Sequence, residues 1–437
     1  MYFKMKKNLF VLLLLTCPCW SFGQELLTLE QAISLTLENN FDIRIAKNEV
    51  EIAEENVTIG NAGMLPRING IITNNNTILN TTQTQATGNE IEIDGAKNRN
   101  FNYGLGLEWT IFDGFRMFAR HNQLKEQQKL SETELKVELL SKVSEVYATY
   151  FLLVNQQNLL TTADSIIAIS DFRLKTAQNK FEIGKASKLE VLNAEVDYNT
   201  DISAKIRLQE QYAITKIAMN TILIRPAAAD FIVSNIVLID KSLKLNELDS
   251  LALAQNPSLQ IQYLTKKVQE YELKQVKANR LPTISLTSGY NFIRSESPFG
   301  FIIQTSGQNF NYGIAATMNV FDGFNQNRNE KVSKIQLANT QLQIERQTQT
   351  IQTQLASFYQ SYLSNLALLE IEQKNEKIAK QNLNITLEKF KIGTISPIDF
   401  RTAQLNYTNA IIRLTNAELT AKQTEINLKE LAGNLSF

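Results

Sequence analysis

Apolar and polar residues alternate along two segments of the chain, about 210 residues apart. In each segment the apolar positions recur at every second residue, and the positions between them are mostly Asn, Gly, Ala, Thr or Glu. They are Phe101, Tyr103, Leu105, Leu107, Trp109 and Ile111 in the first segment, and Phe310, Tyr312, Ile314, Ala316, Met318 and Val320 in the second. A period of two predicts a strand with one apolar face.

Both strand patterns stop at the sequence Phe-Asp-Gly-Phe, and a helical pattern begins there. Residues 115–183 and 324–392 contain neither glycine nor proline, and an unbroken helix of that length would reach ~100 Å. Apolar residues three and four positions apart predict a packed seam, as at Leu135, Leu139 and Val143. Each run ends at a lone glycine followed by a second breaker-free run, which predicts a helical hairpin.

The whole chain follows this duplication. Leu65-Pro66 recurs as Leu281-Pro282, and the sequence at 180–184 recurs at 389–393. The offset changes from 216 to 209 residues within the polar connection between the strands of each copy, as a surface loop tolerates. We therefore expect an internal two-fold repeat in which the two halves form one intertwined domain.

The duplication predicts the following organisation. Residues 1–23 are a signal peptide, and 24–225 are a first repeat of a helix, two strands and a long helical hairpin. Residues 226–437 are an equatorial linker and the second repeat. Weaker alternation at 68–78 and 284–292 supplies a partner strand in each copy, which gives four strands per chain. The polar stretch 79–99 is expected to be an exposed loop.

The N-terminus predicts export. Lys4, Lys6 and Lys7 precede a short apolar run, and small residues follow it, so we expect cleavage after Gly23. Cys17 lies in a poor context for lipidation. Both cysteines of the chain precede Gly23, so the mature protein would have no thiol chemistry. Removal of the signal leaves 41 basic against 44 acidic residues, which gives no basis for nucleic-acid binding.

The strands suit a membrane. A strand of ~11 residues tilted by ~45° matches the thickness of the hydrocarbon core, and aromatic residues flank the apolar band of outer-membrane barrels. A soluble sandwich is the alternative, since its strands also alternate. Four strands cannot close alone, so a barrel requires several chains. The expected membrane-strand aromatics are Phe101, Tyr103, Trp109, Tyr290, Phe292, Phe310 and Tyr312.

The sequence has few features that would indicate an enzyme. Its one histidine, His121, lies near the start of a long helical run, where a surface residue is the usual explanation. There is no paired metal-ligand spacing, phosphate-binding loop or nucleophile elbow. We therefore expect no catalytic residue, no cofactor and no metal site.

The two hairpin tips are the candidate docking sites. Apolar residues flank a turn glycine in each, and the tip residues are Ile183, Gly184, Lys185, Ile392, Gly393 and Thr394. A glycine that ends a helix explains the glycines on its own, whereas exposed apolar residues would add a docking surface. Glu190 and Asp399 each lie six residues beyond a turn glycine. On a symmetric tube these acids would form rings that could bind cations or repel one another. As single surface charges they would have no particular function.

These motifs, in this order and duplicated, resemble the TolC-like outer-membrane efflux family over essentially the whole mature chain. The resemblance rests on the opening at residues 27–32, Leu-Pro before each first strand, Phe-Asp-Gly after each second strand, and the Phe-x-x-Gly tips. It implies a mainly α protein with a membrane β-barrel portion. Long α-helical hairpins would form an α-barrel, and four strands per chain would contribute to a trimeric twelve-stranded barrel.

The resemblance also implies a function and partners. The protein would be a homotrimeric exit duct in the outer membrane of a Gram-negative bacterium, in contact with its lipid, with most of the chain in the periplasm. A periplasmic membrane-fusion adaptor and an inner-membrane transporter of the RND or ABC type would supply the cargo and the energy, in efflux or type I secretion. No nucleic acid is implied.

Carried over residue by residue, the family's periplasmic gate falls on Asp399, Glu190, Phe390, Ile395 and Thr402. Asp399 and Glu190 match acids of the family. Thr402, Ile395 and Phe390 replace an acid, an arginine and a tyrosine, so closure is expected to depend more on apolar packing. At the tips Lys185 replaces an apolar residue, which bears on adaptor choice.

A protein of another class remains as an alternative. An envelope-anchored coiled-coil structural or adhesion protein would share the long helices. It would lack amphipathic strands, which this chain has.

Overall fold

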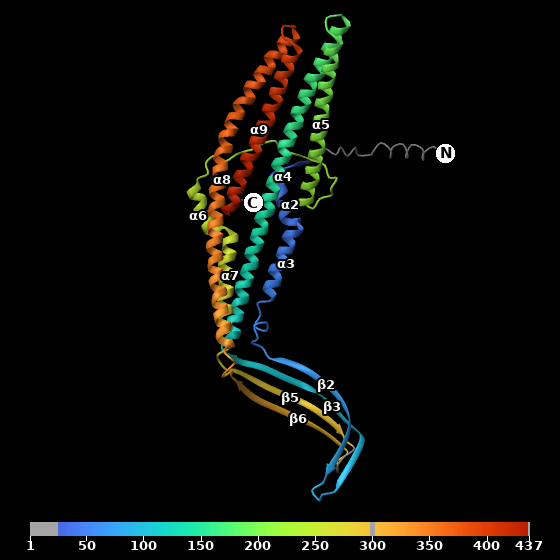
Figure 1. Ribbon diagram of the computed structural model, residues 1–437, viewed down its shortest axis with the longest axis vertical. Coiled ribbons are helices and arrows are strands. Elements are labelled where there is room, and N and C mark those ends of the chain that lie inside the picture. Colours follow the sequence, from blue (N-terminus) through green and yellow to red (C-terminus); the bar gives the residue numbers. More distant parts are fainter. Residues whose placement is uncertain (1–24, 298–301, 436–437) are drawn as a thin grey trace, which may run out of the picture. The chain divides into compact units, whose positions relative to one another are not determined.

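The computed structural model describes residues 25–297 and 302–435 (Figure 1). The predicted signal peptide at 1–23, with Cys17, lies outside these residues. The elements in chain order are β1 Glu25–Leu27, α2 Leu29–Asn39, α3 Phe41–Glu55, β2 Arg67–Thr84, β3 Glu90–Asp113, α4 Arg116–Glu182, α5 Lys188–Ile222, β4 Phe231–Val233, α6 Leu245–Gln255, α7 Pro257–Ala278, β5 Thr283–Glu296, β6 Gln304–Thr317, α8 Asn325–Lys391 and α9 Pro397–Leu431.

The chain divides into two compact units. The first comprises residues 25–44, 138–256 and 351–435, and the second comprises 45–137 and 257–350. Each unit takes segments from both sequence repeats. The long helices α4 and α8 each run through both units.

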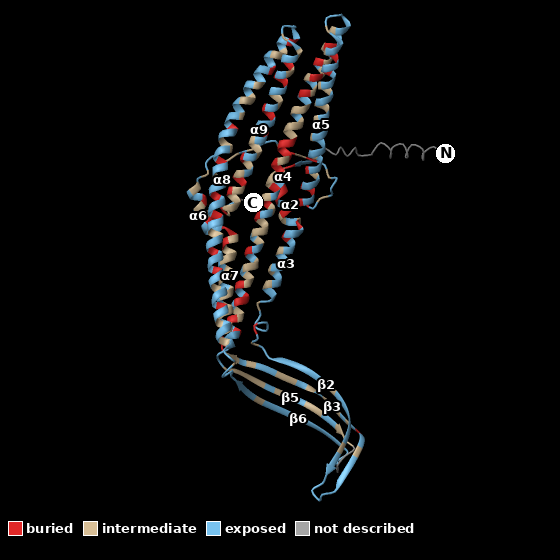
Figure 2. Ribbon diagram, viewed as in Figure 1, coloured by how far each residue is buried: buried red, intermediate tan, exposed pale blue. Residues whose placement is uncertain are grey.

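The first unit contains the helical hairpins that the sequence predicts. The chain reverses between α4 and α5 and again between α8 and α9, in both cases at the predicted glycine. Buried residues recur along these helices where they pack together (Figure 2). Apolar spacing of three and four, rather than intrinsic helix propensity, stabilises helices of this kind.

The main core of the first unit gathers around the short parallel pair β1–β4. Leu27 on β1, Phe231 on β4 and Leu153 on α4 belong to this cluster, and all three are fully buried. The Tyr150 hydroxyl donates to the Leu27 carbonyl at 3.1 Å, and burial raises its pKa. Thr28 caps α2 through a reciprocal capping box with Gln31, which explains the opening motif at residues 27–32.

A crossing segment joins β4 to α6 in the first unit and is held by charges. Asp240 accepts from the Ser242 hydroxyl at 2.6 Å and the Ser242 backbone N–H at 3.0 Å, and Lys429 lies 3.2 Å away. These groups lower the pKa of Asp240 to about 2. Buried Glu425 accepts from the Asp240 backbone N–H at 3.0 Å, so the segment is fixed to α9.

The second unit contains one four-stranded antiparallel sheet, in the order β2-β3-β5-β6. The four predicted strands are confirmed, but two of them are longer than expected. β2 continues to Thr84 and β3 begins at Glu90, so the prediction of a polar loop over 79–99 is wrong. Threonines favour strands, and Gly88, at φ 83°, allows a tight turn.

The last strand is shorter than expected. β6 ends at Thr317, so Met318 and Val320 lie outside it. In the first copy the equivalent residues continue β3, where Phe112 pairs with Ile284 and Asp113 with Thr283. No strand of the described chain lies beside β6 on its other side, so the second copy lacks such a partner.

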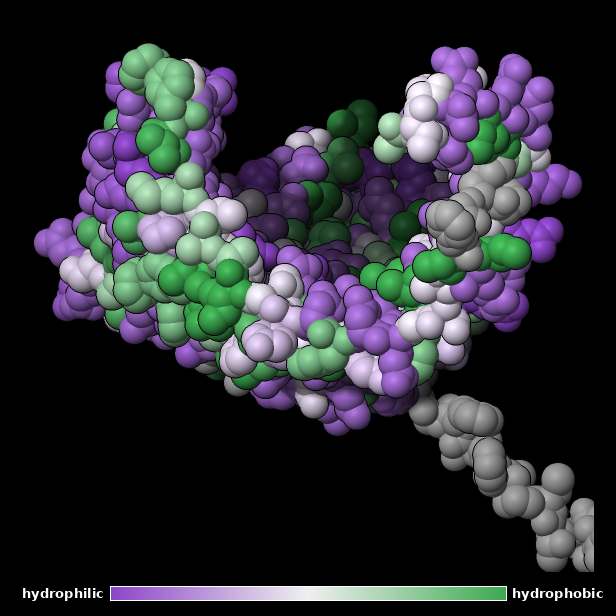
Figure 3. Space-filling view, turned by 90° about the horizontal axis from the view of Figure 1, so that it is seen from below, coloured by the Kyte–Doolittle hydropathy of each residue, from purple (hydrophilic) through white to green (hydrophobic). Residues whose placement is uncertain are grey.

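The register assigns each paired strand residue to one of two faces. Directly opposed residues share a face, as do Tyr103 and Phe292, or Gly106 and Gly289. One face carries leucine, isoleucine and the predicted aromatics. The other is rich in glycine, asparagine, serine and threonine. Apolar and polar residues also lie side by side on the surface drawn in Figure 3.

Within residues 25–297 and 302–435, no helix has an apolar stretch long enough to cross a bilayer.

Candidate functional site

Both hairpin tips in the first unit end their first helix in the same way. Gly184 and Gly393 adopt φ values of 75° and 77°, in the left-handed region that favours glycine. The Lys185 backbone N–H donates to the Lys180 carbonyl at 2.7 Å, and Thr394 repeats this with Lys389 at 2.9 Å. This is the Schellman arrangement that satisfies the last carbonyls of a helix.

A serine starts the second helix of each tip. Ser187 caps α5 and Ser396 caps α9. Asp399 donates its backbone N–H to the Ser396 hydroxyl at 3.2 Å, and its carboxylate accepts from that hydroxyl at 2.7 Å. The exposed Asp399 therefore has a local structural role at the positive end of a helix.

The outermost tip residues are exposed. Ile183 is 66% exposed and Ile392 is 74% exposed, and Lys185 and Thr394 are exposed beside them. A Cβ added at either turn glycine would meet no atom within 4 Å, so glycine serves the backbone conformation there and not close packing. Two apolar side chains held in water at rigid turns are suited to contact with another protein.

Phe390 lies behind the tip and is not presented at the surface. It is 1% exposed and stacks on Phe400, with ring centroids 4.8 Å apart and planes at 10°. The half-buried Ile395 packs against the same cluster, and the Lys180 ammonium lies 5.2 Å from the Phe390 ring centroid. Phe390 therefore holds α8 against α9 within one chain.

A cavity of about 470 Å³ lies between the two hairpins and brings three of the predicted gate residues together. Glu190, Phe390 and Thr402 line it, whereas Asp399 and Ile395 do not. Further lining residues are Arg173, Asp197 and Arg401, which the sequence analysis did not identify.

These three residues belong to an ion-pair network that joins the hairpins. Arg401 on α9 donates to both carboxylate oxygens of Asp201 on α5, at 2.8 and 3.0 Å. Arg173 on α4 pairs with Asp197, which also lies 3.5 Å from Arg401. Arg173 is only 3% exposed, and the side chains of Arg401 and Asp201 are also largely out of water, whereas Asp197 is 32% exposed.

Neutral groups extend the network to the backbone of α4. Gln404 donates to the Ser170 hydroxyl at 2.7 Å and to the Ile166 carbonyl at 3.3 Å, and Ser170 donates to Asp201. Asp197 and Asp201 are four residues apart on one helix, which is the signal that could have drawn attention to them.

A second candidate site lies in the second unit, at the Phe-Asp-Gly-Phe motifs. Asp113 caps α4 by accepting from the Met117 N–H at 3.1 Å, and Asp322 caps α8 by accepting from the Gln326 N–H at 2.7 Å. The two residues that follow each aspartate have positive φ; they are Gly114 at 70°, Phe115 at 69°, Gly323 at 67° and Phe324 at 67°.

The flanking rings also repeat. Phe112 and Phe115 meet edge to face at 87°, with ring centroids 5.2 Å apart, and Phe321 and Phe324 do so at 88° and 5.4 Å. The motif is therefore a rigid turn that redirects the chain from strand to helix.

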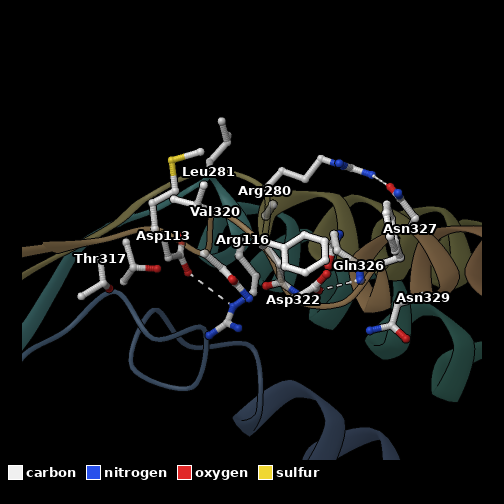
Figure 4. Close-up of a pocket in the computed structure, with 17 residues that line it drawn as sticks. Asp113, Arg116, Arg280, Leu281, Thr317, Val320, Asp322, Gln326, Asn327 and Asn329 are labelled. Carbon is white, nitrogen blue, oxygen red and sulfur yellow. Dashed lines mark hydrogen bonds and ion pairs between the residues drawn. The ribbon is translucent and has the colours of Figure 1, made fainter.

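The surroundings of the two turns differ. A Cβ at Gly114 would lie 2.5 Å from the Ala278 carbonyl oxygen and 2.8 Å from Leu281, whereas one at Gly323 would meet only Asn325, at 3.9 Å. Beside Gly323 the structure has an open cavity of about 840 Å³, lined by residues such as Asp113, Arg116, Leu281, Val320 and Asp322 (Figure 4).

The predicted strand aromatics share one face of the sheet. Tyr103 stacks on Phe292 with ring centroids 4.8 Å apart, and Tyr290 meets Phe292 edge to face at 5.2 Å. Phe310 lies opposite Tyr290 in the register. Trp109 is nearer the helical end, where its indole N–H donates to the Met64 carbonyl at 2.9 Å. An aromatic ring with one polar group suits a membrane interface.

An amphipathic four-stranded sheet and long helical hairpins in one chain are what a channel-type protein of the outer membrane requires, and comparison with known proteins shows that the chain is of this class. The family model for "Outer membrane efflux protein" matches residues 32–223 and 248–434. The chain therefore belongs to the outer membrane efflux protein family, and it is an outer-membrane transport channel.

Several known proteins are similar to this chain over nearly its full length. The proteases secretion protein PrtF of Dickeya chrysanthemi is 20% identical over 93% of this chain and 88% of its own. The outer membrane protein TolC of Escherichia coli is 20% identical over 99% and 87%. The solved structure of the outer membrane protein VceC from Vibrio cholerae has a TM-score of 0.76 at 14% identity, covering 93% and 96%.

Proposed function

We propose that this protein is the passive exit duct of a tripartite efflux or type I secretion system, built as a homotrimer. Twelve strands, four from each chain, would form the barrel in the outer membrane. The observation that carries the proposal is the open edge of an amphipathic sheet, since β2 and β6 have no strand partner on their outer sides within the described chain. In lipid an unpaired edge is too costly, so the edges must pair between copies.

The internal repeat supports a specific seam between copies. Within one chain, β3 pairs with β5, and Gly114 packs against Ala278 and Leu281. The same contact made between copies would place β6 beside β2 of the next chain, with Gly323 against Ala62 and Leu65. This arrangement would fill the open cavity beside Gly323. It would also extend the pairing to Phe321, which is 72% exposed in the single chain and corresponds to Phe112 of the first copy.

Charge supports the same seam. In the chain Asp113 lies opposite Thr283. An offset of 209 converts Asp113 to Asp322, and an offset of 216 in the other direction converts Thr283 to Arg67. In the proposed seam Asp322 of one copy would therefore lie opposite Arg67 of the next, and these residues have opposite charges. The seam joins different surfaces head to tail, and such an interface produces a closed ring when its rotation closes.

The helices offer a second seam in the first unit. Apolar residues recur every seventh position near the end of α8 and remain exposed, namely Ile371, Ile378, Ile385 and Ile392. The helix α5 also exposes Leu192 and Ile206, two heptads apart, and neither lines the cavity between the hairpins. Apolar residues at heptad spacing form the seam of a coiled coil, so neighbouring copies would pack α5 against α8 and form an α-barrel.

The tips would form the regulated periplasmic end. Ile183 and Ile392 would contact the helical hairpins of a periplasmic membrane-fusion adaptor, and an RND or ABC transporter in the inner membrane would supply the energy. Gly184 and Gly393 shape the tips, and Lys185 and Thr394 would influence which adaptor binds.

In the gate, Phe390 and Ile395 would hold the α8–α9 tip of each chain in its closed shape. Glu190 and Thr402 line the cavity between the hairpins, and Asp399 would contribute both a helix cap and a ring of negative charge.

The test is planar-bilayer conductance of the detergent-extracted protein, with its oligomeric mass measured on the same sample. A trimer that forms small cation-favouring channels supports the proposal, and an Asp399→Asn channel that is less cation-selective supports the ring of acids. A monomer, or an assembly that does not conduct, would overturn the duct and favour an envelope structural protein.

A further inference from the structure

The apolar face of the sheet ends in a group of basic residues. Lys97 and Arg99 on β3 and Arg294 on β5 lie just beyond the aromatic residues of that face, on the side away from the helices. All three side chains are exposed.

The strand register places them on the face that carries the aromatics. Arg294 lies directly opposite Phe101, two residues beyond Phe292, and Arg99 lies two residues beyond Phe101. Lys97 follows after two more residues, opposite Ile78. Residues two apart on a strand share a face and are ~6.8 Å apart, so the three positions lie within ~15 Å.

This face is basic only at that end. Between Phe101 and Lys97 its one acidic residue is Glu296, which lies opposite Arg99 and pairs with Arg294 at 3.0 Å. Beyond Lys97, Glu92 and Glu90 lie on the same face, opposite Thr82 and Thr84. Among the described residues, Lys97 and Arg99 have no ion-pair partner. On the opposite face, the rows from Gly106 to Asn98 carry no charged residue.

We propose that Lys97, Arg99 and Arg294 bind the phosphate groups of a lipid in the outer leaflet, with its acyl chains along the aromatic band. Guanidinium groups hold phosphate oxygens through two parallel hydrogen bonds, and a lysine adds a point charge. Basic clusters at a membrane surface attract anionic head groups in this way. The inference rests on the proposed function, which puts this face of the sheet against lipid.

A weaker explanation is that the long basic side chains simply reach water at the membrane boundary. That explanation requires no phosphate. The two differ in what they predict for a lipid that keeps its acyl chains and sugars but has lost its phosphates.

The experiment is native mass spectrometry of the purified trimer titrated with three probes. The probes are lipid A with both phosphates, lipid A with both removed, and inorganic phosphate. We expect the wild-type protein to bind phosphorylated lipid A about 10-fold or more tightly than the dephosphorylated form, and this difference to shrink in high salt. This comparison requires no variant.

A triple substitution, Lys97→Gln with Arg99→Gln and Arg294→Gln, should abolish the preference for the phosphorylated lipid. The matched control is Lys331→Gln with Lys377→Gln and Lys380→Gln, which removes three exposed helical lysines and should keep the preference. Glu296→Gln should strengthen lipid binding, since it removes the acid that pairs with Arg294.

Equal affinity of the wild-type trimer for the two lipids would overturn the inference. Displacement of the lipid by millimolar inorganic phosphate would also overturn it, because the site would then be for a free ion. A trimer that conducts but binds both forms of lipid A equally leaves the proposed duct intact. A protein that neither assembles nor conducts removes the duct and the lipid site together.

Discussion

Arg401 donates hydrogen bonds to both carboxylate oxygens of Asp201, and these bonds connect α9 to α5, about 200 residues earlier in the chain. The two side chains are 12% and 13% exposed, so water and salt screen their attraction only weakly. With Arg173 and Asp197, the pair connects the two hairpins of one chain. Any opening of the tips must therefore move both hairpins together or break this network.

Removal of one member should be costly. Asp201→Asn leaves Arg401 without its charge partner in a largely dry site, so we expect the free energy of unfolding to fall by about 3 kcal/mol. The double variant Asp201→Asn with Arg401→Gln should lose less than the sum of the single variants. Thermal or chemical unfolding measures both effects.

The matched control for this network is Asp171→Asn. Asp171 pairs with Lys175 at 2.7 Å on the exposed side of α4, and its removal should leave stability unchanged. Strictly additive losses in the Asp201–Arg401 cycle would show that the two residues do not act as a pair.

The stacked pair Phe390 and Phe400 predicts a second effect. Phe390→Ala removes a fully buried ring and should cost about 3 to 5 kcal/mol, whereas Phe390→Leu should cost less. Single-channel conductance should rise in Phe390→Ala and, more weakly, in Ile395→Ala. Phe181→Ala is the control, because that ring is 43% exposed on the outside of the other tip. Unaltered conductance in both variants would refute the part assigned to Phe390 and Ile395 in closure.

The proposed seam can be tested by disulfide formation. Within the chain Gly106 lies opposite Gly289, and the repeat offsets convert this pair to Ala315 and Thr73 of the next copy. The chain's own cysteines both lie in the predicted signal peptide. Ala315→Cys with Thr73→Cys should therefore give covalent trimers on a denaturing gel after mild oxidation.

The control pair for the seam is Ala315→Cys with Thr84→Cys, which the offsets place far apart along the strands. It should remain monomeric on the same gel. Trimers from the control pair alone would mean that the copies meet in another register.

The lowered pKa of Asp240 should make the stability of the protein depend on pH. Its pKa of about 2 lies below the ordinary value of 3.8, chiefly because of the hydrogen bonds from Ser242. The native state therefore favours the charged form, so this contribution is fully present above about pH 4 and is lost as the pH falls towards 2. Asp240→Asn should melt at a lower temperature than the wild type at pH 7, and the two should converge near pH 2. If the difference between the two melting temperatures stayed the same from pH 7 to pH 2, this assignment would be contradicted.

The sequence predicted the long helices, their reversal points and the faces of the strands well. Each of these features appears twice, so a weak signal in one copy is supported by the other. The turn glycines were identifiable because a left-handed residue is needed where a helix ends, as the φ values of Gly184 and Gly393 show.

Other features depend on contacts that periodicity does not reveal. Asp201 and Arg401 lie on helix positions that read simply as polar, and only the packing of α5, α4 and α9 brings them together. The early end of β6 was missed because a strand pattern alone does not show whether a partner strand is present. The length of β2 was missed because its last residues are threonine, asparagine and glutamine, with weak alternation.

The uncharged face of the sheet has a consequence for transport. From Gly106 outward this face presents mostly amides, hydroxyls and bare backbone, with Ile71 and Ile293 as its apolar side chains, and its nearest charges are Glu108 and Arg67, which lie opposite each other. If this face lines the duct, cations, anions and neutral molecules meet the same weak field on their way out. The last part of the route would then be indifferent to cargo, and selection would fall to the helical end and to the proteins that dock there.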